Sequence, residues 1–340
     1  AVFPGIIGYD RTVIPQIENA ILSRHNFILL GLRGQAKSRL IRQLYRLLDD
    51  YIPVIPGTQL NEDPLNPISP MGKRMVAEMG DDMPIEWLRP HERFHEKLAT
   101  PDVSIADLIG DIDPIKAARE KLDISNEEVI HWGIIPRTNR GIFAINELPD
   151  LQPRIQVGLL NILEENDIQV RGFPLRVPLD MMLVFTANPE DYTNRGNIIT
   201  PLKDRIDSQV VTHYPRTLSD ARAITSGEVS HDNAAAYIPE FLRNILEEVA
   251  FEARTSEYVD QSSGVSARVS ISALENFLSN VERRAARNGE KDNYPRMCDL
   301  YSVIPSVSGK IELVYEGEQE GAVVVAHNLI SQAINKEFLK

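Results

Sequence analysis

The chain has 340 residues, of which 36 are Lys or Arg and 49 are Asp or Glu, and its net charge is −13. This acidic balance disfavours a surface built mainly to bind DNA or RNA. The single cysteine, Cys298, excludes a disulfide within the chain and indicates a reducing compartment. With no membrane-length apolar run and no signal-peptide pattern, we expect a cytoplasmic protein with one large α/β domain and a smaller one.

The first predicted element is a helix over residues 13–23, where apolar residues recur at helical spacing. The loop before it, FPGIIG at residues 3–8, comes shortly before the strongest signal of the chain. From this position we expect the loop, through Ile7 and Gly8, to contact the base of a bound nucleotide.

That signal lies between residues 26 and 38, NFILLGLRGQAKS. The apolar run at 27–30 predicts a buried parallel strand, and a helical pattern follows over residues 40–48. The loop between them consists of Gly31, Leu32, Arg33, Gly34, Gln35, Ala36, Lys37 and Ser38. A strand, a glycine loop, Lys-Ser and a helix in this order are typical of a phosphate-binding loop.

The residue types of this loop suit a nucleotide. Glycines let backbone N–H groups turn inward around phosphate oxygens, and the helix N-terminus adds its dipole. Lys37 can reach the β- and γ-phosphates, and the Ser38 hydroxyl can ligate Mg²⁺. Ala36 stands where the common pattern has glycine, which we interpret as a variant of the loop. The sequence therefore predicts ATP and Mg²⁺ as ligands, against the alternative of an ordinary strand–helix turn.

The next part of the chain predicts an insertion. Residues 51–55 predict a second strand, and about 56–100 predict loops and short helices, since proline, glycine and methionine are frequent and periodicity is weak. Within this insertion, HERFH at 91–95 matches the H-E-x-x-H pattern of zinc peptidases. We favour a solvated, charged helix start after Pro90, because no third zinc ligand follows.

A second insertion at about 111–134 includes half of a hairpin at 127–132. GIFAINE at 141–147 then gives the second strong signal, an apolar strand that ends in Asn146 and Glu147. In an ATPase we expect this strand beside that of the phosphate loop, with its first polar residue holding the magnesium shell and the glutamate orienting or deprotonating water. Asn146 stands where aspartate is usual, and its amide oxygen can accept from a magnesium-bound water but carries no charge.

Further elements follow in order. Residues 152–165 predict a helix, and about 166–180 predict a hairpin with its turn at 172–174. Residues 181–185 predict a buried strand, and Asn188 follows it, where a side-chain amide can position water near the γ-phosphate. The alternative for Asn188 is an ordinary turn residue.

The composition changes after the last predicted core strand at 210–212. We divide the chain into a nucleotide-binding α/β core at 1–215 and a mainly helical lid at 216–340. The lid is predicted to contain a helix with an apolar face of Phe241, Leu242, Ile245, Leu246 and Val249. A second helix has the apolar face Leu274, Phe277, Leu278 and Val281, with Ser272 and Glu275 as a capping box at its start and Gly289 at its end. A strand at 310–315 and a helix at 323–338 follow.

The ordered motifs resemble those of the AAA+ ATPases. They are GLRGQAKS, GIFAINE, a hairpin before TANP, PLKDR, and Ser266-Ala267-Arg268 in the lid. The hairpin and the extra segment before GIFAINE resemble the clade of the magnesium-chelatase ATPase subunit and the MoxR-type ATPases. The resemblance extends to about residue 290 and implies a P-loop AAA+ core, with a parallel five-stranded sheet between helices, and a smaller helical lid.

The resemblance also implies a role for each matched residue. These roles are Walker A for Lys37 and Ser38, Walker B for Asn146 and the catalytic Glu147, sensor 1 for Asn188, the arginine finger for Arg205, and sensor 2 for Arg268. An arginine's planar donors suit the charge that develops on a transferring phosphoryl group. A finger that reaches the neighbour's nucleotide implies a homo-oligomeric ring, expected to be a hexamer, with Arg137 and Arg140 as weaker candidates for its interface.

The resemblance favours a ring ATPase that remodels or activates a partner protein bearing a von Willebrand A domain, in the manner of MoxR-type chaperones or a chelatase motor. Asn146 suggests a second interpretation, a nucleotide-gated binding scaffold with little hydrolysis. A nucleic-acid motor or a transcriptional activator is disfavoured by the charge of −13 and by the lack of a GAFTGA-like loop. A zinc peptidase is the least favoured interpretation.

Overall fold

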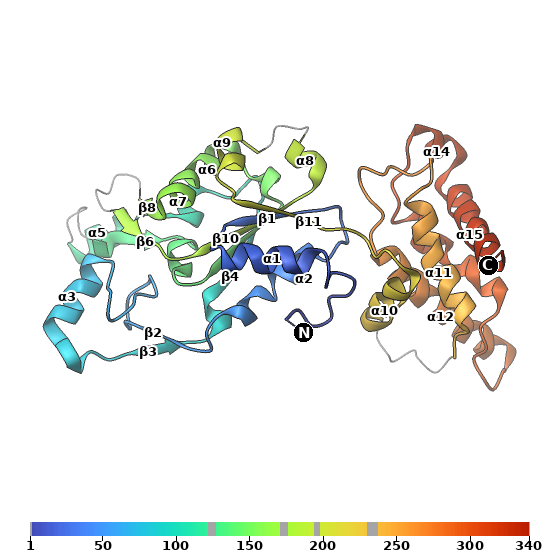
Figure 1. Ribbon diagram of the computed structural model, residues 1–340, viewed down its shortest axis with the longest axis horizontal. Coiled ribbons are helices and arrows are strands. Elements are labelled where there is room, and N and C mark those ends of the chain that lie inside the picture. The colour runs from blue at the N-terminus through green and yellow to red at the C-terminus, as the bar shows by residue number, and fades with distance from the viewer. Residues whose placement is uncertain (1, 122–126, 171–175, 194–197, 230–236, 340) are drawn as a thin grey trace.

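The computed structural model describes residues 2–121, 127–170, 176–193, 198–229 and 237–339. An α/β core and a helical lid lie next to each other along the long axis of the molecule (Figure 1). The chain passes from the core to the lid directly after the strand that ends at Val211.

The described strands of the core form a central parallel sheet of five, in the order β11-β1-β10-β7-β4. Its strands are β1 (Phe27–Leu30), β4 (Phe94–Leu98), β7 (Ile142–Asn146), β10 (Met182–Ala187) and β11 (Ser208–Val211). The central strands are continuous apolar runs because helices cover both faces of the sheet. The fold class expected from the sequence is confirmed.

Two apolar layers enclose the sheet. One packs side chains of β1 such as Phe27 and Leu29 against the helix α1 (Val13–Leu22) and the short helix α2 (Lys37–Ile41). The opposite layer packs Phe143 and Phe185 against the helices α6 (Pro153–Gly158), α7 (Leu160–Glu165) and α9 (Thr200–Asp204). Successive residues of each strand alternate between these layers, so both faces are buried.

The strand order corrects one expectation. We expected the strand that ends in Asn146 to lie beside the strand of the phosphate loop, but β10 lies between β7 and β1. The chain leaves β7, crosses one face through α6 and α7, and returns as β10 next to β1. Because all three strands are equally buried and apolar, their sequences carry no signal that distinguishes this order.

Among the described residues, three two-stranded antiparallel units lie outside the central sheet. Their strands are β2 (Ile52–Val54) with β3 (Glu86–Leu88), β5 (Gly110–Ile112) with β6 (Ile130–Trp132), and β8 (Asp167–Gln169) with β9 (Arg176–Pro178). The two hairpins expected near 111–134 and 166–180 are confirmed, and the predicted turn at 172–174 lies outside the described residues. The strand expected at 51–55 exists as β2 but belongs to none of the central pairs.

The insertion expected at about 56–100 ends earlier than predicted. Residues 94–98 form β4, the edge strand of the central sheet, which pairs with β7. Three consecutive polar residues, His95, Glu96 and Lys97, occupy its centre, and neither an apolar run nor a polar–apolar alternation marks it as a strand. The helices of the insertions and connections are α3 (Pro70–Met79), α4 (Ile105–Leu108), α5 (Pro114–Glu120) and α8 (Pro189–Thr193).

The lid has an apolar core of its own. Its helices are α10 (Leu218–Glu228), α11 (Glu240–Ala253), α12 (Arg268–Asn288), α13 (Ile304–Ser308), α14 (Tyr315–Glu320) and α15 (Ala322–Phe338). The predicted stripes of α11 and α12 are buried in this core, except that Phe241 is 38% exposed and packs against Phe338. Gly289 ends α12 with φ +65°, as expected.

Two details of the lid were predicted wrongly. Residues 310–315 form no strand: Leu313 makes a single bridge to Val259, and α14 already begins at Tyr315. Ser272 and Glu275 form no capping box because α12 begins at Arg268, one turn earlier. Polar–apolar alternation predicted the strand, and a Ser-x-x-Glu spacing predicted the helix start. Such local patterns do not determine where an element forms or begins once the chain is packed.

Short 3₁₀ helices complete the described elements. They are η1 (Leu44–Leu47), η2 (Gly80–Asp82), η3 (Pro90–Arg93), η4 (Glu127–Val129), η5 (Pro136–Thr138), η6 (Leu148–Asp150) and η8 (Met297–Val303). The helix expected over 40–48 is therefore split into α2 and η1, and Leu47 is exposed. Within the described ranges, no helix combines the length and apolarity needed to cross a bilayer.

Candidate functional site

The phosphate loop follows β1 at the edge of the sheet where the parallel strands end. The N–H of Gly31 donates to the carbonyl of Ala187 at the end of β10, which ties the start of the loop to the neighbouring strand (3.2 Å). Glu147 follows β7 and Asn188 follows β10, so three of the predicted elements of the site meet at this edge. In open parallel sheets, ligands bind at this carboxyl edge.

Lys37 is buried within the loop. Its Nζ donates to the carbonyl oxygens of Gly31 and Leu32 (the latter at 3.1 Å) and to Asn188 Oδ1 at 3.4 Å. Burial lowers the pKa of Lys37 below 10.5, and the nearby Glu147 carboxylate opposes this shift. Two predicted residues, the lysine and the sensor asparagine, therefore form one hydrogen-bonded cluster.

The loop keeps a left-handed residue directly before the lysine although that residue is alanine. Ala36 has φ +57° and ψ +16° and is the N-cap of α2. A residue with a Cβ is strained in this region, which glycine adopts freely. The backbone thus retains the conformation expected of the common glycine, and Ala36 bears the strain.

Glu147 occupies a constrained position after β7. Its backbone is also left-handed, with φ +55° and ψ +52°, and its N–H donates to Thr186 Oγ1 at 2.9 Å. Burial raises the pKa of Glu147 above 4.5, Lys37 opposes this shift, and Asp150 and Asp191 add to it. A glutamate with a raised pKa holds a proton more strongly than a free carboxylate does, which suits a general base.

Asn146 contacts the neighbouring strand rather than Glu147. Its Nδ2 donates to Glu96 Oε2 on β4 at 3.4 Å, while its Oδ1 is buried and has no hydrogen-bond partner in the described structure. A buried acceptor that has no hydrogen-bond partner carries a desolvation cost. A water molecule bound to magnesium would remove that cost by donating to this oxygen. With the exposed Ser38 hydroxyl lining the adjoining cleft, these residues fit a magnesium–nucleotide complex.

A cleft of about 810 Å³ lies between the loop and the lid. Lys37, Ser38 and Glu147 line its core side, and Ser266, Ala267 and Arg268 line its lid side. The structure therefore brings Arg268, the predicted sensor 2, to the same cleft as the phosphate loop.

The N-terminal loop borders a second, smaller cavity of about 60 Å³ next to the phosphate loop. Ile7 lines it together with Ile6, Pro215 and Ile224, so a large part of its wall is apolar. Gly8 is not among its lining residues, so the predicted contact of Gly8 with a base finds no support in this geometry.

Tyr9, which also lines this cavity, was not recognised from the sequence. Its hydroxyl donates to the carbonyls of Gln35 at 2.9 Å and His213 at 2.7 Å, and burial raises the pKa of Tyr9 to about 12. Tyr9 thereby links the N-terminal segment, the phosphate loop and the chain after β11. No motif marked it, because these partners are 26 and 204 residues away in sequence.

Direct contacts between the loop and the lid were also missed. Arg33 Nε donates to the Gly264 carbonyl at 3.1 Å, and its guanidinium pairs with Glu312. The Tyr214 hydroxyl donates to the Arg33 carbonyl at 2.9 Å, and the Arg254 guanidinium lies 4.1 Å from the centre of the Tyr214 ring. Hydrogen bonds and an ion pair therefore link the loop directly to the lid.

Arg205, the predicted arginine finger, lies elsewhere. It follows α9, and its Nε and guanidinium donate to Glu164 Oε2 at 2.9 and 2.6 Å. It is absent from the described residues that line the cleft of its own chain. Of the weaker candidates, Arg140 binds the carbonyl of Pro53 and pairs with Asp63 within its own chain, whereas Arg137 is exposed.

The H-E-x-x-H match does not form the helix that this pattern requires. His91 lies in η3, and His95 lies in the strand β4. The chain therefore does not present the two histidines one helical turn apart. The expected charged helix start is a single 3₁₀ turn, and in the described parts of the chain no cluster of three metal-ligating side chains was found.

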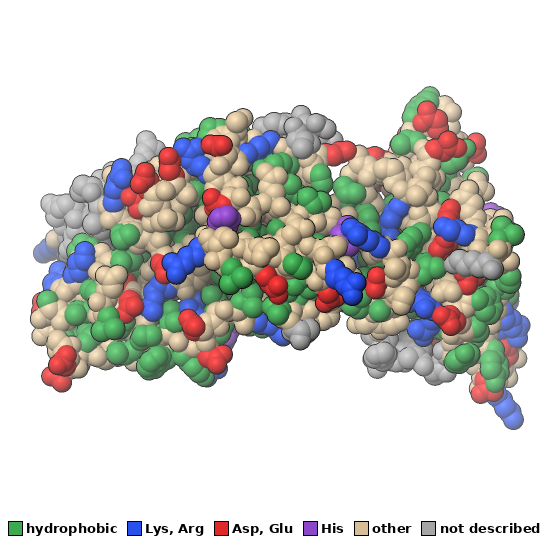
Figure 2. Space-filling view, viewed as in Figure 1, with side chains coloured by type: hydrophobic (Ala, Val, Ile, Leu, Met, Phe, Trp, Pro, Cys, Tyr) green, Lys and Arg blue, Asp and Glu red, His purple; other side chains and the backbone are tan. Residues whose placement is uncertain are grey.

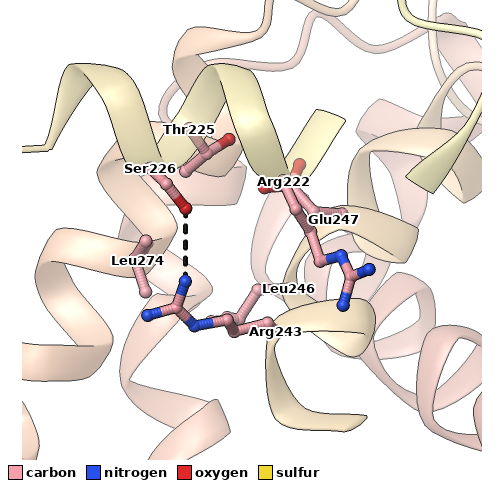
Figure 3. A pocket seen from close by; sticks show the side chains of 7 residues that line it. All are labelled: Arg222, Thr225, Ser226, Arg243, Leu246, Glu247 and Leu274. Atoms are coloured by element: carbon pink, nitrogen blue, oxygen red, sulfur yellow. Dashed lines mark hydrogen bonds between the residues drawn. The ribbon is translucent and has the colours of Figure 1, made fainter. Parts of the chain in front are cut away.

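A pocket within the lid is too small for an organic ligand. It is lined by residues of α10, α11 and α12, and Arg243 donates to Ser226 Oγ at 3.2 Å across it (Figure 3). Its volume of about 10 Å³ is that of a single water molecule. Burial raises the pKa of the Glu247 carboxyl that borders this pocket, and we assign the pocket to the packing of the lid.

The sequence of this chain is similar to those of two magnesium-chelatase subunits. No family model matches the chain. It is 25% identical over 239 residues to the magnesium-chelatase 38 kDa subunit of Cereibacter sphaeroides, which covers 68% of this chain and 64% of that subunit. The subunit of Rhodobacter capsulatus is 25% identical over 218 residues, which covers 63% of this chain and 56% of that subunit. The chain thus spans less than two thirds of the length of these relatives.

The fold has counterparts among solved structures. NtrX of Brucella abortus in complex with ATP aligns with a TM-score of 0.50 at 12% identity, covering 98% of this chain and 70% of that one. At this identity the likeness concerns the fold alone.

Ala36→Gly should stabilise the protein. We expect the free energy of unfolding to rise by about 0.5 to 1 kcal/mol, because relief of left-handed strain exceeds the added entropy of the unfolded chain. Urea unfolding followed by circular dichroism measures this difference. The matched control is Ala77→Gly in the exposed part of α3, which should destabilise by about 1 kcal/mol. Equal destabilisation by both substitutions would contradict the strain at Ala36.

Proposed function

Because the chain is an AAA+ relative of the magnesium-chelatase 38 kDa subunits, we propose that it is a ring ATPase that hydrolyses ATP to ADP and phosphate to remodel or activate a partner protein. The observation that carries this proposal is the meeting of Lys37, Asn188 and Glu147 at one edge of the sheet, facing Arg268 across a cleft. Each has the charge or polarity that phosphoryl transfer to water requires.

ATP binding uses the loop and the small cavity beside it. The triphosphate would lie against the loop amides, and Lys37 would exchange its bonds to the Gly31 and Leu32 carbonyls for phosphate oxygens. The base would enter the cavity lined by Ile7. Magnesium, held by Ser38 directly and by Asn146 through water, would neutralise phosphate charge.

Hydrolysis uses residues from two subunits in this proposal. Glu147 accepts the proton of the attacking water, Asn188 orients that water, and Arg268 contacts the γ-phosphate from the lid. Arg205 would leave Glu164 and donate to the nucleotide of a neighbouring subunit, where an arginine is worth several orders of magnitude in rate. A finger supplied in this way requires a closed ring, for which we propose six subunits.

The partner is proposed to carry a von Willebrand A domain, as in MoxR-type or chelatase-motor systems. The antiparallel units β5–β6 and β8–β9 lie outside the central sheet and are the proposed contact elements. A nucleic-acid motor is less favoured, since on the face shown in Figure 2 Lys and Arg side chains are interspersed with Asp and Glu.

A second candidate function is a nucleotide-gated scaffold that hydrolyses ATP very slowly. Asn146 favours it, because the amide provides no charge to hold magnesium. Phosphate release measured with and without the partner separates the two functions. A rate that stays at the uncatalysed level in both conditions would favour the scaffold.

Mixing two inactive variants tests the shared active site. Arg205→Ala should bind ATP but lose about a thousandfold in hydrolysis, because the finger is missing. Lys37→Ala should fail to bind ATP while keeping its own finger. Phosphate release should return when the two variants are mixed, since intact pockets then meet intact fingers. Arg74→Ala, which removes another surface arginine–glutamate pair, is the control. Full activity of Arg205→Ala alone would contradict the proposal.

The pH dependence of hydrolysis reports on Glu147. Burial raises the pKa of Glu147 above 4.5, so the carboxylate becomes protonated, and inactive as a base, as the pH falls through that raised pKa. We expect the acidic limb of the phosphate-release rate to lie above pH 4.5, in protein that stays folded by circular dichroism. A limb at or below that pH would show that another group limits the reaction.

A further inference from the structure

The network around Asn146 has a feature that the proposed function leaves unused. Asn146 is 9% exposed, its Oδ1 has no partner, and its Nδ2 donates to the carboxylate of Glu96. A carboxamide can be turned either way, and an isolated one would present oxygen or nitrogen to a neighbouring water. A carboxylate accepts only, so Glu96 fixes which end of this amide faces it.

Strand register places the two side chains together. In the pairing of β4 with β7, Glu96 lies opposite Ala144, two residues before Asn146. Side chains alternate along a strand, so Glu96, Ala144 and Asn146 share one face of the sheet. This is the face that α2 covers, because Ala144 packs in the same apolar layer as Leu40.

Arg42 holds Glu96 from that helix. Its Nε donates to Glu96 Oε1 at 2.8 Å and Oε2 at 3.0 Å, and its outer guanidinium nitrogen lies 2.8 Å from Oε1. Arg42 is one turn after Ser38, whose carbonyl accepts from the Arg42 N–H at 3.0 Å. Ser38, Arg42 and Glu147 all line the cleft that faces the lid. The contacts thus run from the phosphate loop through Arg42 and Glu96 to Asn146.

The geometry points to Glu96 as a positioning residue for the magnesium–nucleotide site: it holds Asn146 Nδ2, and so keeps the unpartnered Oδ1 available to accept from a magnesium-bound water. This inference rests on the proposed function. Glu96 acts through Asn146 and touches neither substrate nor metal.

The alternative is that Glu96 merely anchors Arg42 and the strand edge. That purely structural role is indifferent to whether residue 146 is an amide or a carboxylate. The positioning role does depend on residue 146, because an aspartate there has no N–H to donate to Glu96 and would be repelled by its carboxylate. Removing the charge of Glu96 should therefore weaken magnesium binding when residue 146 is asparagine and strengthen it when residue 146 is aspartate.

A double-mutant cycle measures this dependence. The probe is a fluorescent ATP analogue at fixed concentration, titrated with MgCl₂, so the readout is the magnesium concentration at half-saturation of binding and not activity. Glu96→Gln should raise that concentration about tenfold, the usual cost of losing an outer-shell partner. In the Asn146→Asp background, Glu96→Gln should instead lower it, since a like-charge pair is removed.

Two further variants keep the result interpretable. Arg42→Ala, which frees the Glu96 carboxylate, should raise the magnesium requirement less than Glu96→Gln does. Glu240→Gln, which removes the charge of another arginine-paired surface glutamate, should leave it unchanged. Thermal melting without nucleotide confirms that each variant folds.

The outcomes separate the two levels of the proposal. If the parent protein binds the ATP analogue and needs magnesium, but Glu96→Gln has no effect or the same effect in both backgrounds, the positioning role is wrong and the proposed function stands. If the parent protein does not bind the analogue at all, both are wrong.

Discussion

A buried ammonium group organises the candidate site. Lys37 donates to two carbonyls of its own loop and to Asn188, in a position where burial already lowers its pKa. A buried cation needs compensating acceptors, and the carbonyls of the loop supply them only while the loop is curled around it. The left-handed backbone of Ala36 and the placement of Asn188 belong to the geometry that encloses this one group, and the Lys37 ammonium also limits the rise that burial causes in the pKa of Glu147.

The same loop is joined to the lid by direct contacts. Arg33 contacts Gly264 and Glu312, and Tyr214 connects the Arg33 carbonyl to Arg254. In the proposed nucleotide complex, phosphate oxygens would replace the carbonyl oxygens around Lys37, and the contacts of Arg33 would change with the loop. A ligand can shift the equilibrium between two arrangements of the loop and lid only if it binds one of them more tightly than the other. In the proposed function, the bonds exchanged in the loop would provide that difference, and the lid would bring Arg268, which lines the cleft, to the nucleotide.

Much of the fold and part of the site could be predicted from the sequence, and the division has a physical reason. Residues set by local geometry, such as Lys37 after its strand and Asn188 after β10, were found because strand, loop and helix patterns are local. Strand order, the edge strand β4 and the contact between Glu96 and Asn146 depend on pairing across many residues, which no local pattern encodes. Tyr9 was missed for the same reason. The roles of Arg205 and Arg268 stay predictions, since they require nucleotide and a neighbouring subunit.

The central claim is that Lys37 and the loop around it form the nucleotide site. The most direct measurement is a titration of the folded protein with a fluorescent ATP analogue and magnesium, in parallel with Lys37→Ala at matched concentration. Saturable binding by the parent, and its loss in the variant without a change in melting temperature, is the result predicted here. Identical curves for the two proteins, or no saturation by the parent, would contradict it.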